Sequence, residues 1–325
     1  MESAGRVSYK GMMFRLAHVS DVHLGPLPDV TYRDLASKRM VGYVNWQRNR
    51  RHILHDGVLG HIVSDIKATG VDHLAVTGDL VNLALDAEIE LARLWLDTLG
   101  TPTDVSVVPG NHDAYVPGAF DKVCRSWGAW MAGDGAHAPT DRHAFPYLRV
   151  RGNVALIGVS TARATAPFMA NGFFRDDQSH RLGALLDKAG REGLFAVVMI
   201  HHPPVRGAVP QHKRLFGIGN FQKMVARHGA DLVLHGHSHE PTLYWIGGGR
   251  RRKVPVVGVA AGGQAVGGSH PAAQWNLLEI SGHRGAWSLR LIRRGLSGTT
   301  IPVSELSRID LVGQPAEAST TGQAT

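Results

Sequence analysis

The feature that constrains this chain most is the segment from His235 to His239, which reads His-Gly-His-Ser-His. It follows directly on the run Asp231-Leu-Val-Leu234. A short apolar run bounded by turn residues is typical of a buried strand, so the histidines should leave a sheet at the C-terminal end of that strand. Open α/β sheets bind their ligands at this edge.

Four further apolar segments also end in Asp, Asn or His. Asp21 and His23 follow residues 14–20, Asp79 follows 73–78, Asn111, His112 and Asp113 follow 105–110, and His201 and His202 follow 195–200. The candidate residues therefore span positions 21 to 239. The whole of that stretch is predicted to fold around one site as one domain.

The side-chain types in this set indicate a site for two metal ions. Neutral imidazoles and carboxylates suit Zn, Mn and Fe, and a set without cysteine argues against a structural zinc knot. One central carboxylate can bridge two ions roughly 3.5 to 4 Å apart, as in phosphatases and nucleases. We expect Asp79 to be that bridge, because Gly78 allows a sharp backbone turn before it.

Five short blocks, in this order, resemble those of the calcineurin-like metallophosphoesterases. They are Asp21-Val-His23, Gly78-Asp79-Leu-Val-Asn82, Gly110-Asn111-His112-Asp113, His201-His-Pro203 and Gly236-His237-Ser-His239. The resemblance covers most of the chain, from about Arg15 to Glu240. It implies an α/β fold, the metallophosphoesterase four-layer sandwich, in which two mixed β-sheets flanked by helices carry a two-metal site at their edge.

The resemblance also implies which residues bind the two divalent ions, which would be Mn, Fe or Zn. The first ion would take Asp21, His23, Asp79 and His239, and the second would take Asp79, Asn111, His201 and His237. A metal-bound hydroxide would then attack phosphorus in line. Asp113 and His202 are expected to support the ligands, and His235 to make a structural hydrogen bond at the end of its strand.

His112 has a separate predicted role, because side chains of adjacent residues diverge and Asn111 is a ligand. By resemblance, His112 stabilises the transition state and protonates the leaving oxygen. An acid three residues after the bridging Asp often orients this histidine in the family, and this chain has Asn82 there. An amide accepts a hydrogen bond but carries no charge, so His112 is expected to hold its proton less tightly.

The blocks also narrow the substrate class. Serine/threonine phosphatases of this superfamily carry Gly-Asp-x-Val-Asp-Arg-Gly and Arg-Gly-Asn-His-Glu, which this chain lacks. Its blocks are more similar to bacterial phosphodiesterases, so we predict a phosphodiesterase. The alternatives are a UDP-diacylglucosamine-type pyrophosphate hydrolase at the membrane surface and a DNA exonuclease, the latter without a recognisable DNA-reading module. A non-catalytic binding scaffold would need defective ligands, and none of the set is missing.

The formal net charge of +8 suits phosphate-ester substrates and nucleic acids alike. Lys38 to Arg51 mixes cations with Tyr43 and Trp46 between two ligand strands. It could form a lid that meets an anionic membrane surface, or it could stack and neutralise a nucleic-acid strand. The alternative is that Trp46 packs on the core while the arginines are solvated.

The ends of the chain are predicted to lie outside the folded domain. Residues 1–12 are interpreted as a disordered leader, 13–308 as the metallophosphoesterase domain and 309–325 as a disordered tail. No apolar stretch approaches the ~20 residues of a membrane-spanning helix, and no apolar core behind Arg6 and Lys10 indicates a secretory signal. The single cysteine, Cys124, fits a reducing compartment. We therefore expect a cytoplasmic protein, free or peripheral to the inner face of the membrane.

Overall fold

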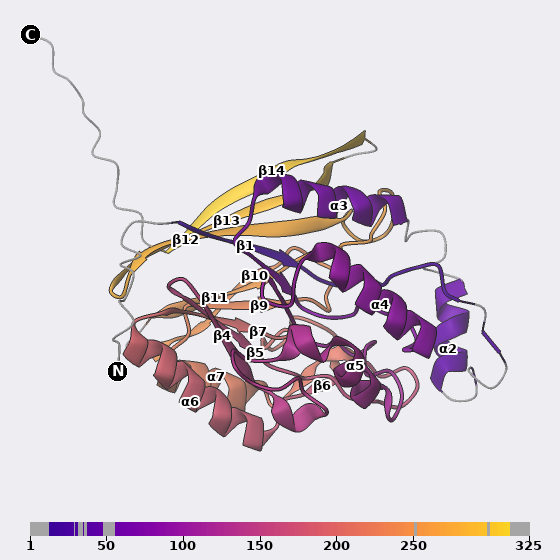
Figure 1. Ribbon diagram of the computed structural model, residues 1–325, viewed down its shortest axis with the longest axis horizontal. Coiled ribbons are helices and arrows are strands. Elements are labelled where there is room, and N and C mark those ends of the chain that lie inside the picture. Colours follow the sequence, from indigo (N-terminus) through magenta and orange to yellow (C-terminus); the bar gives the residue numbers. More distant parts are fainter. Residues whose placement is uncertain are drawn as a thin grey trace, which may run out of the picture.

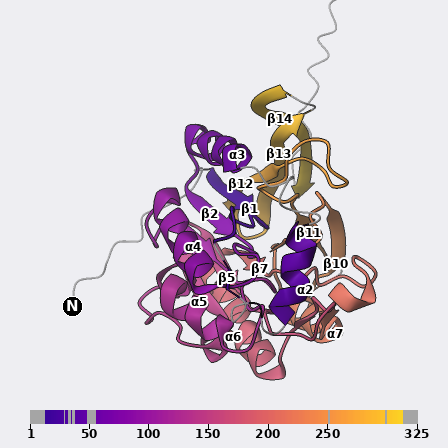
Figure 2. The same ribbon diagram turned by 90° about the vertical axis from the view of Figure 1, so that its right-hand side faces the viewer.

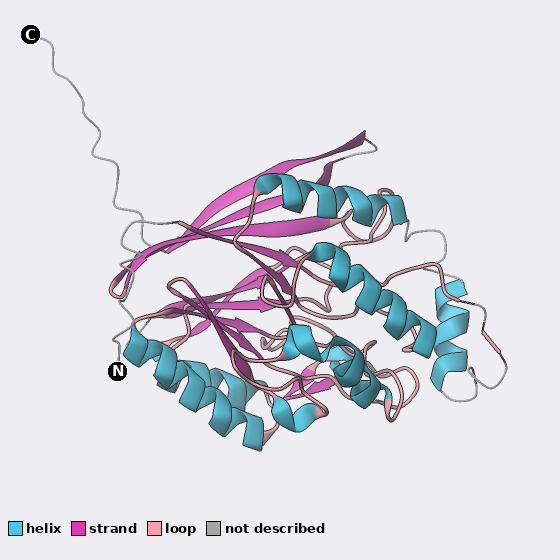
Figure 3. Cartoon of the chain, viewed as in Figure 1, coloured by secondary structure: helices cyan, strands magenta, loops and turns pink. Residues whose placement is uncertain are grey.

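Two mixed β-sheets lie face to face in the computed structural model, with helices on their outer sides (Figure 1). Figure 3, coloured by secondary structure, shows the strands as two inner layers between helices. The structure describes residues 13–28, 30–31, 35, 38–47, 56–249, 252–297 and 300–312.

The first sheet combines parallel and antiparallel strands in the order β14-β13-β12-β1-β2-β3. β1, β2 and β3 run parallel, and β12, β13 and β14 continue the sheet in antiparallel fashion from the other side of β1. The strands are β1 (Phe14–Val19), β2 (His73–Val76), β3 (Val105–Val107), β12 (Gln274–His283), β13 (Ala286–Ser297) and β14 (Thr300–Val312).

The second sheet has the order β10-β11-β9-β7-β5-β4, with four parallel strands in its middle and an antiparallel strand at each edge. Its strands are β4 (Tyr147–Arg151), β5 (Val154–Gly158), β7 (Phe195–Met199), β9 (Leu232–His235), β10 (Leu243–Gly247) and β11 (Lys253–Gly258). A small parallel pair, β6 (Gly172–Phe173) and β8 (Leu215–Phe216), stands beside it.

The second sheet is covered on both faces, which explains its continuous apolar strands. In β7, Phe195, Val197 and Met199 belong to the core between the sheets, whereas Ala196 and Val198 belong to a second core beneath the helices. Side chains alternate along a strand, so each face needs its own apolar set. All five residues are buried as a result.

The helices complete the outer layers. α6 and α7 cover the outer face of the second sheet, and α3 lies over the first sheet (Figure 1). Figure 2, turned by 90°, places α2 in front, on the side that lies to the right in Figure 1. The helices are α2 (Lys38–Asn45), α3 (Asp56–Thr69), α4 (Asp86–Leu99), α5 (Ala119–Trp127), α6 (Asp176–Glu192) and α7 (Ile218–His228).

One predicted boundary differs from the structure. β14 pairs with β13 and continues to Val312, so the folded chain extends past residue 308, where we predicted the domain to end. Apolar residues alternate only at the two ends of this segment, in Ile301-Pro-Val303 and Ile309-Asp-Leu311, and register shifts in its pairing with β13 interrupt the pattern between them. The predicted leader 1–12 and residues 313–325 of the predicted tail lie outside the described residues.

Candidate metal centre

The loops after β1, β2, β3, β7 and β9 bring all seven predicted ligands into one cluster. Groups of three histidine or aspartate side chains from this set place their ligand atoms within 4.8 Å of one another. We call the cluster the metal centre. It consists of a first half, Asp21, His23, Asp79 and Asn111, and a second half, His201, His237 and His239.

Asp79, in the first half, faces side chains of both halves. Its Oδ2 atom is 3.9 Å from His23 Nε2 and 3.4 Å from His201 Nε2. The same His201 nitrogen is 3.2 Å from Asn111 Oδ1. Asp79 Oδ1 accepts a hydrogen bond of 2.7 Å from the His112 main-chain N–H. One carboxylate oxygen therefore faces ligands from both sheets, as a bridging position requires.

Asp21 joins the halves at a second point. Its Oδ1 atom is 3.3 Å from His239 Nε2, and its Oδ2 atom accepts a 2.9 Å hydrogen bond from the His237 main-chain N–H. A Cβ atom on Gly236 would lie only 1.9 Å from Ser20 Oγ and 2.5 Å from Asp21 Oδ2. Glycine is needed there because the two loops are in direct contact.

Main-chain carbonyl groups fix the orientation of three ligand rings. His201 Nδ1 lies 2.6 Å from the Thr77 carbonyl, and His23 Nδ1 lies 3.1 Å from the Val81 carbonyl. His237 Nε2 is 2.9 Å from the Lys213 carbonyl. A carbonyl oxygen only accepts, so each of these ring nitrogens carries the proton and the other nitrogen is available to a metal.

The ligands occupy strained backbone conformations. Among the described residues, seven non-glycine residues have positive φ angles, and five of them are Asp21, His23, Asp79, His237 and His239. Left-handed conformations of this kind cost of order 1 kcal/mol or more for a residue with a side chain, and they cluster at functional sites. Gly78 has φ +97° immediately before Asp79, as the sharp turn predicted there requires.

Asp113 supports the first half of the centre without joining it. Its two carboxylate oxygens accept hydrogen bonds of 2.7 to 3.3 Å from the main-chain N–H groups of Asp79, Leu80, Val81 and Gly110. Burial and the nearby Asp79 charge raise the pKa of Asp113 to about 7. The main-chain N–H donors act in the opposite direction, because they favour the ionised carboxylate. The carboxylate holds the loops after β2 and β3 together.

His202 and His235 lie beside the centre as buried, hydrogen-bonded side chains. His202 Nδ1 is 2.8 Å from Thr161 Oγ1 and its Nε2 is 3.2 Å from the Ala170 carbonyl, so both ring nitrogens have protein partners. Burial lowers the pKa of His202 to about 3 and that of His235 to about 4. His235 Nδ1 is 2.9 Å from the Gly236 carbonyl, consistent with the structural role predicted for it.

The partner of His112 differs from the one predicted. His112 Nδ1 lies 2.6 Å from the main-chain carbonyl of Asn82, while the Asn82 side-chain amide donates to the Leu24 carbonyl. Residue 82 thus orients the histidine through its backbone. The carboxylate of Glu88 holds this loop, accepting from the main-chain N–H groups of Asn82, Leu83 and Leu85 at 2.8 to 3.0 Å.

His112 has a second support that we did not predict from the sequence. The Tyr115 ring stacks on the His112 ring, with centroids 5.3 Å apart and an interplanar angle of 17°. Lys38 Nζ lies 4.6 Å from the Tyr115 ring centroid and donates to Thr165 Oγ1 at 2.6 Å and to the Met169 carbonyl at 2.7 Å. Burial lowers the pKa of Lys38 to about 8.

α2 is attached to the same region through Arg39. Arg39 donates to the Leu83 carbonyl at 3.0 Å and to the Ala84 carbonyl at 2.6 Å. Two cations of the predicted Lys38 to Arg51 lid are thus used inside the protein. Trp46 is partly buried and stacks on Tyr43 with centroids 6.4 Å apart. The arginines at 48, 50 and 51 lie outside the described residues.

The donor set fits divalent metal ions. Asp21 and Asp79 are almost fully buried, and among the described residues their ion pairs are all to histidines. Burial opposes their ionisation, yet the surrounding histidines hold the pKa of both carboxyls below the usual range. Burial also disfavours the charged form of His201, but Asp79 and Asp21 raise its pKa to about 9. Buried carboxylates among imidazoles are ligands that Zn, Mn and Fe accept.

Comparison with known families identifies the class of protein. The family model for calcineurin-like phosphoesterases matches residues 14–241. This stretch is well over half of the chain, and the protein therefore belongs to the calcineurin-like phosphoesterases.

A curated relative from Synechococcus sp., described as a probable cyclic nucleotide phosphodiesterase, is 27% identical over 188 residues. The alignment covers 55% of this chain and 62% of the relative, so the chain spans less than two thirds of that relative's length.

Solved structures bear out the predicted sandwich fold. A dimetal phosphatase from Danio rerio is 14% identical, with a TM-score of 0.59, covering 90% of this chain and 98% of that chain. A purple acid phosphatase from yellow lupin seeds is 12% identical, with a TM-score of 0.50, covering 88% of this chain and 52% of that chain. At these identities the likeness concerns the fold alone.

Proposed function

We propose that this protein is a dinuclear-metal-dependent phosphodiesterase. The observation that carries the proposal is the position of Asp79 Oδ2, which faces His23 from one sheet and His201 from the other. The seven residues Asp21, His23, Asp79, Asn111, His201, His237 and His239 would hold the two ions. Bound ions of this kind supply Lewis acidity to a phosphoryl group and lower the pKa of an attacking water.

The chain's own residues would prepare the site for that chemistry. Asp113 keeps the loops after β2 and β3 in register, and the carbonyls of Thr77, Val81 and Lys213 hold the rings with one nitrogen facing inward. Preorganised ligands need no rearrangement when the substrate arrives, which favours the transition state.

His112 would act as the general acid. Its Nδ1 proton is held by the Asn82 carbonyl, which leaves Nε2 to donate a proton to the leaving oxygen. His112 lies within reach of the centre, because its main-chain N–H donates to Asp79 and its ring centroid is 4.8 Å from that of His23.

The diester preference rests on the similarity to the probable cyclic nucleotide phosphodiesterase and on the sequence blocks. The membrane-surface alternative loses two of its cations, since Lys38 and Arg39 are bonded within the protein. Within the described ranges, no helix has the length and apolar character needed to cross a bilayer. We accordingly place a water-exposed phosphodiester ahead of a lipid-linked pyrophosphate, and a cytoplasmic location goes with this proposal.

The test compares metal-loaded protein on bis-p-nitrophenyl phosphate and on p-nitrophenyl phosphate, with Mn, Fe and Zn supplied separately. Hydrolysis of the diester in preference to the monoester, abolished by chelation and restored by metal, is the expected result. A preference for the monoester would make the protein a phosphomonoesterase. Absence of hydrolysis with every metal, in protein that binds two ions, would favour the binding scaffold.

A further inference from the structure

A cavity of about 360 Å³ lies between the segment that follows His112 and the segment that follows β5. Its charged lining residues are Arg142, Arg163 and Arg175, and no acidic side chain in the described part of the chain lines it. We call it the arginine pocket. Its remaining lining residues are Pro117, Gly118, Ser160, Ala162, Ala164, Phe173 and Gln178.

Both walls of the arginine pocket are linked to the metal centre through neighbouring residues. On one side, Thr161 follows the lining residue Ser160, and its Oγ1 is 2.8 Å from His202 Nδ1. The His202 ring is in turn 4.3 Å from the ring of the ligand His237, measured between centroids. On the other side, Pro117 comes two residues after Tyr115, whose ring stacks on His112. Segments that line the pocket thus continue directly into residues that contact the metal centre or His112.

The guanidinium groups of the pocket are not neutralised by the protein to the same degree. Arg175 pairs with Asp177 and donates to His143 Nδ1 at 2.9 Å. Among the described residues, Arg142 and Arg163 have no acidic side chain within ion-pair distance, and Arg163 lies 5.9 Å from the Phe173 ring centroid. The pocket therefore carries an excess of positive charge close to a site for phosphate esters.

The wall of the pocket is rigid. The Gln178 side chain accepts from the Ser160 main-chain N–H at 2.9 Å and donates to the Ser160 carbonyl at 2.8 Å, so it pins the segment after β5 to α6. Phe173 keeps 44% of its surface exposed and offers a flat apolar side to the cavity.

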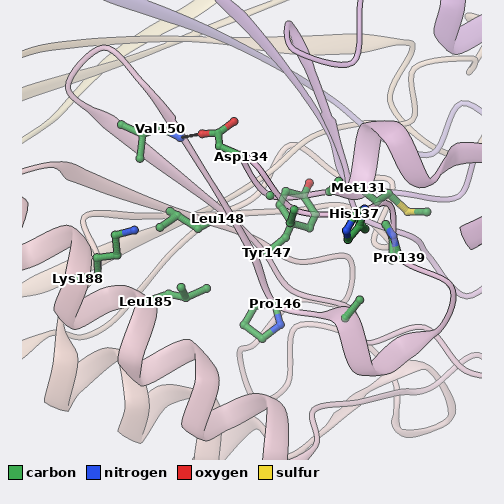
Figure 4. A pocket seen from close by; sticks show the side chains of 14 residues that line it. Met131, Asp134, His137, Pro139, Pro146, Tyr147, Leu148, Val150, Leu185 and Lys188 are labelled. Atoms are coloured by element: carbon green, nitrogen blue, oxygen red, sulfur yellow. Dashed lines mark hydrogen bonds between the residues drawn. The ribbon is translucent and has the colours of Figure 1, made fainter. Parts of the chain in front are cut away.

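Two other cavities are less suited to a phosphate group of the substrate. The cavity of about 340 Å³ shown in Figure 4 is largely apolar, and its Asp134 accepts from the Val150 main-chain N–H at 2.7 Å. A cavity of about 620 Å³ is lined by Arg227, Arg252 and Arg284 but also by the half-buried Asp231, and it adjoins the C-terminal turns of α6 and α7. Helix C-termini disfavour anions. This larger cavity lies at the start of β7 and β9, opposite the metal centre.

We propose that the arginine pocket binds a second phosphate of the substrate. The preferred substrates would then be phosphodiesters that carry another phosphate several bonds from the scissile phosphorus, such as a 3′-phosphorylated nucleoside 5′-diester. Guanidinium groups bind phosphate through paired N–H donors, and Phe173 would meet the sugar or base between the two phosphates. This inference rests on the proposed phosphodiesterase function.

The test uses two substrates that differ only in the distal phosphate: thymidine 5′-(p-nitrophenyl phosphate) and its 3′-phosphate. We expect kcat/KM of the full-length, metal-loaded protein to be about tenfold higher for the 3′-phosphate, as a charge-assisted hydrogen bond would give. The substitutions Arg163→Gln and Arg142→Gln should bring this ratio towards one. Arg227→Gln, in the cavity opposite the centre, is the matched control and should leave the ratio unchanged.

A binding measurement makes the test independent of turnover. Calorimetric titration with thymidine 3′,5′-bisphosphate and with thymidine 5′-monophosphate should show about tenfold tighter binding of the bisphosphate, lost in Arg163→Gln. A wild-type ratio near one in both assays, or a ratio that survives both arginine substitutions, would overturn the second-phosphate site. If neither ester is hydrolysed, the phosphodiesterase proposal fails, and the titration still decides whether the pocket binds phosphate.

Discussion

The two halves of the metal centre are built from different chemistry. The first half supplies both carboxylates, Asp21 and Asp79. The loop of Asp79 is held by main-chain hydrogen bonds to Asp113, and the main-chain N–H of Asp21 donates to the Gly78 carbonyl. The second half supplies only imidazoles, and its loops reach across to the first: His201 bonds to the Thr77 carbonyl and the His237 main-chain N–H bonds to Asp21. Both carboxylates therefore belong to loops of the first sheet. The second sheet completes the site with imidazoles whose loops bond to the first sheet.

We expect the largest effect from Asp79→Asn, which removes the charge of the one carboxylate that faces side chains of both halves. We expect turnover to fall by roughly 10⁴-fold or more, as when one member of an interdependent catalytic set is lost. Metal analysis should show reduced occupancy of both ions. His202→Gln, beside the second half, is the control and should retain two ions, because both His202 ring nitrogens have protein partners. Two tightly bound ions in Asp79→Asn would contradict the bridging assignment.

His112→Ala tests the part of the first half that faces the substrate. The variant should keep its metals and lose about 10²- to 10⁴-fold in kcat on diesters with poor leaving groups, the range typical of a general acid. The loss should be smaller for p-nitrophenolate, which leaves without needing a proton. An equal loss for both leaving groups would mean that His112 acts by other means.

Asp113→Asn tests whether the hydrogen bonds that hold the loops of the first half contribute more to stability than those beside the second half. Each Asp113 oxygen accepts two main-chain N–H groups, so an amide would turn its NH₂ towards two donors. We expect a loss of stability of roughly 2 to 3 kcal/mol, as for a buried donor left unpaired. Chemical unfolding of the metal-free protein measures this loss, with His202→Gln, beside the second half, as the comparison. A larger effect in His202→Gln would reverse the comparison.

Lys38→Met tests the support that α2 gives to the first half. The variant loses the ammonium that lies over Tyr115 and bonds Thr165 and Met169, so Tyr115 and His112 should be held less firmly. We expect kcat to fall by about tenfold, which corresponds to about 1.4 kcal/mol, with KM and metal content little changed. Lys67→Met, on α3, is the control. A change confined to KM would indicate that Lys38 contacts the substrate instead.

The last prediction concerns a histidine of the first sheet away from the metal centre, and its effect is confined to acidic pH. Burial, with Arg151 and Arg149 nearby, lowers the pKa of His73 to about 3 from 6.5. The unfolded chain therefore binds a proton that the folded chain excludes, and this contribution to stability is present above pH 6.5 and lost as the pH falls towards 3. Between pH 6 and 4 the free energy of unfolding of the wild type should fall with decreasing pH. In His73→Gln this fall should be smaller by roughly 1 kcal/mol per pH unit. Equal slopes in wild type and variant would contradict the buried neutral imidazole.

Much of this arrangement could be predicted from the sequence, because the informative residues stand at strand ends. The strand 14–19 and the clustering of residues at strand ends followed from apolar runs that end in Asp, Asn or His, and the choice of the seven candidate ligands followed from the family resemblance. The supports were harder to predict. The carbonyls of Asn82, Thr77 and Lys213 orient rings through backbone atoms that every residue possesses, so no side-chain pattern marks them.

Other residues that support His112 have no distinctive sequence pattern. Glu88 reads as an acid in the first turn of α4, yet its carboxylate bonds the loop that orients His112. Tyr115 and Lys38 are 77 positions apart, and only the docking of α2 brings them together. The end of β14 was missed because register shifts in its pairing with β13 interrupt the apolar alternation that identifies a strand.

The position of β1 has a consequence for synthesis on the ribosome. β1 lies inside the first sheet, paired to β2 on one side and to β12, residues 274–283, on the other. One edge of the strand therefore keeps its N–H and C=O groups unpaired until most of the chain has emerged, a condition that exposes strands to wrong partners. The nascent protein would be most vulnerable to aggregation during elongation, and a chaperone that shelters this first strand would raise the yield of active protein.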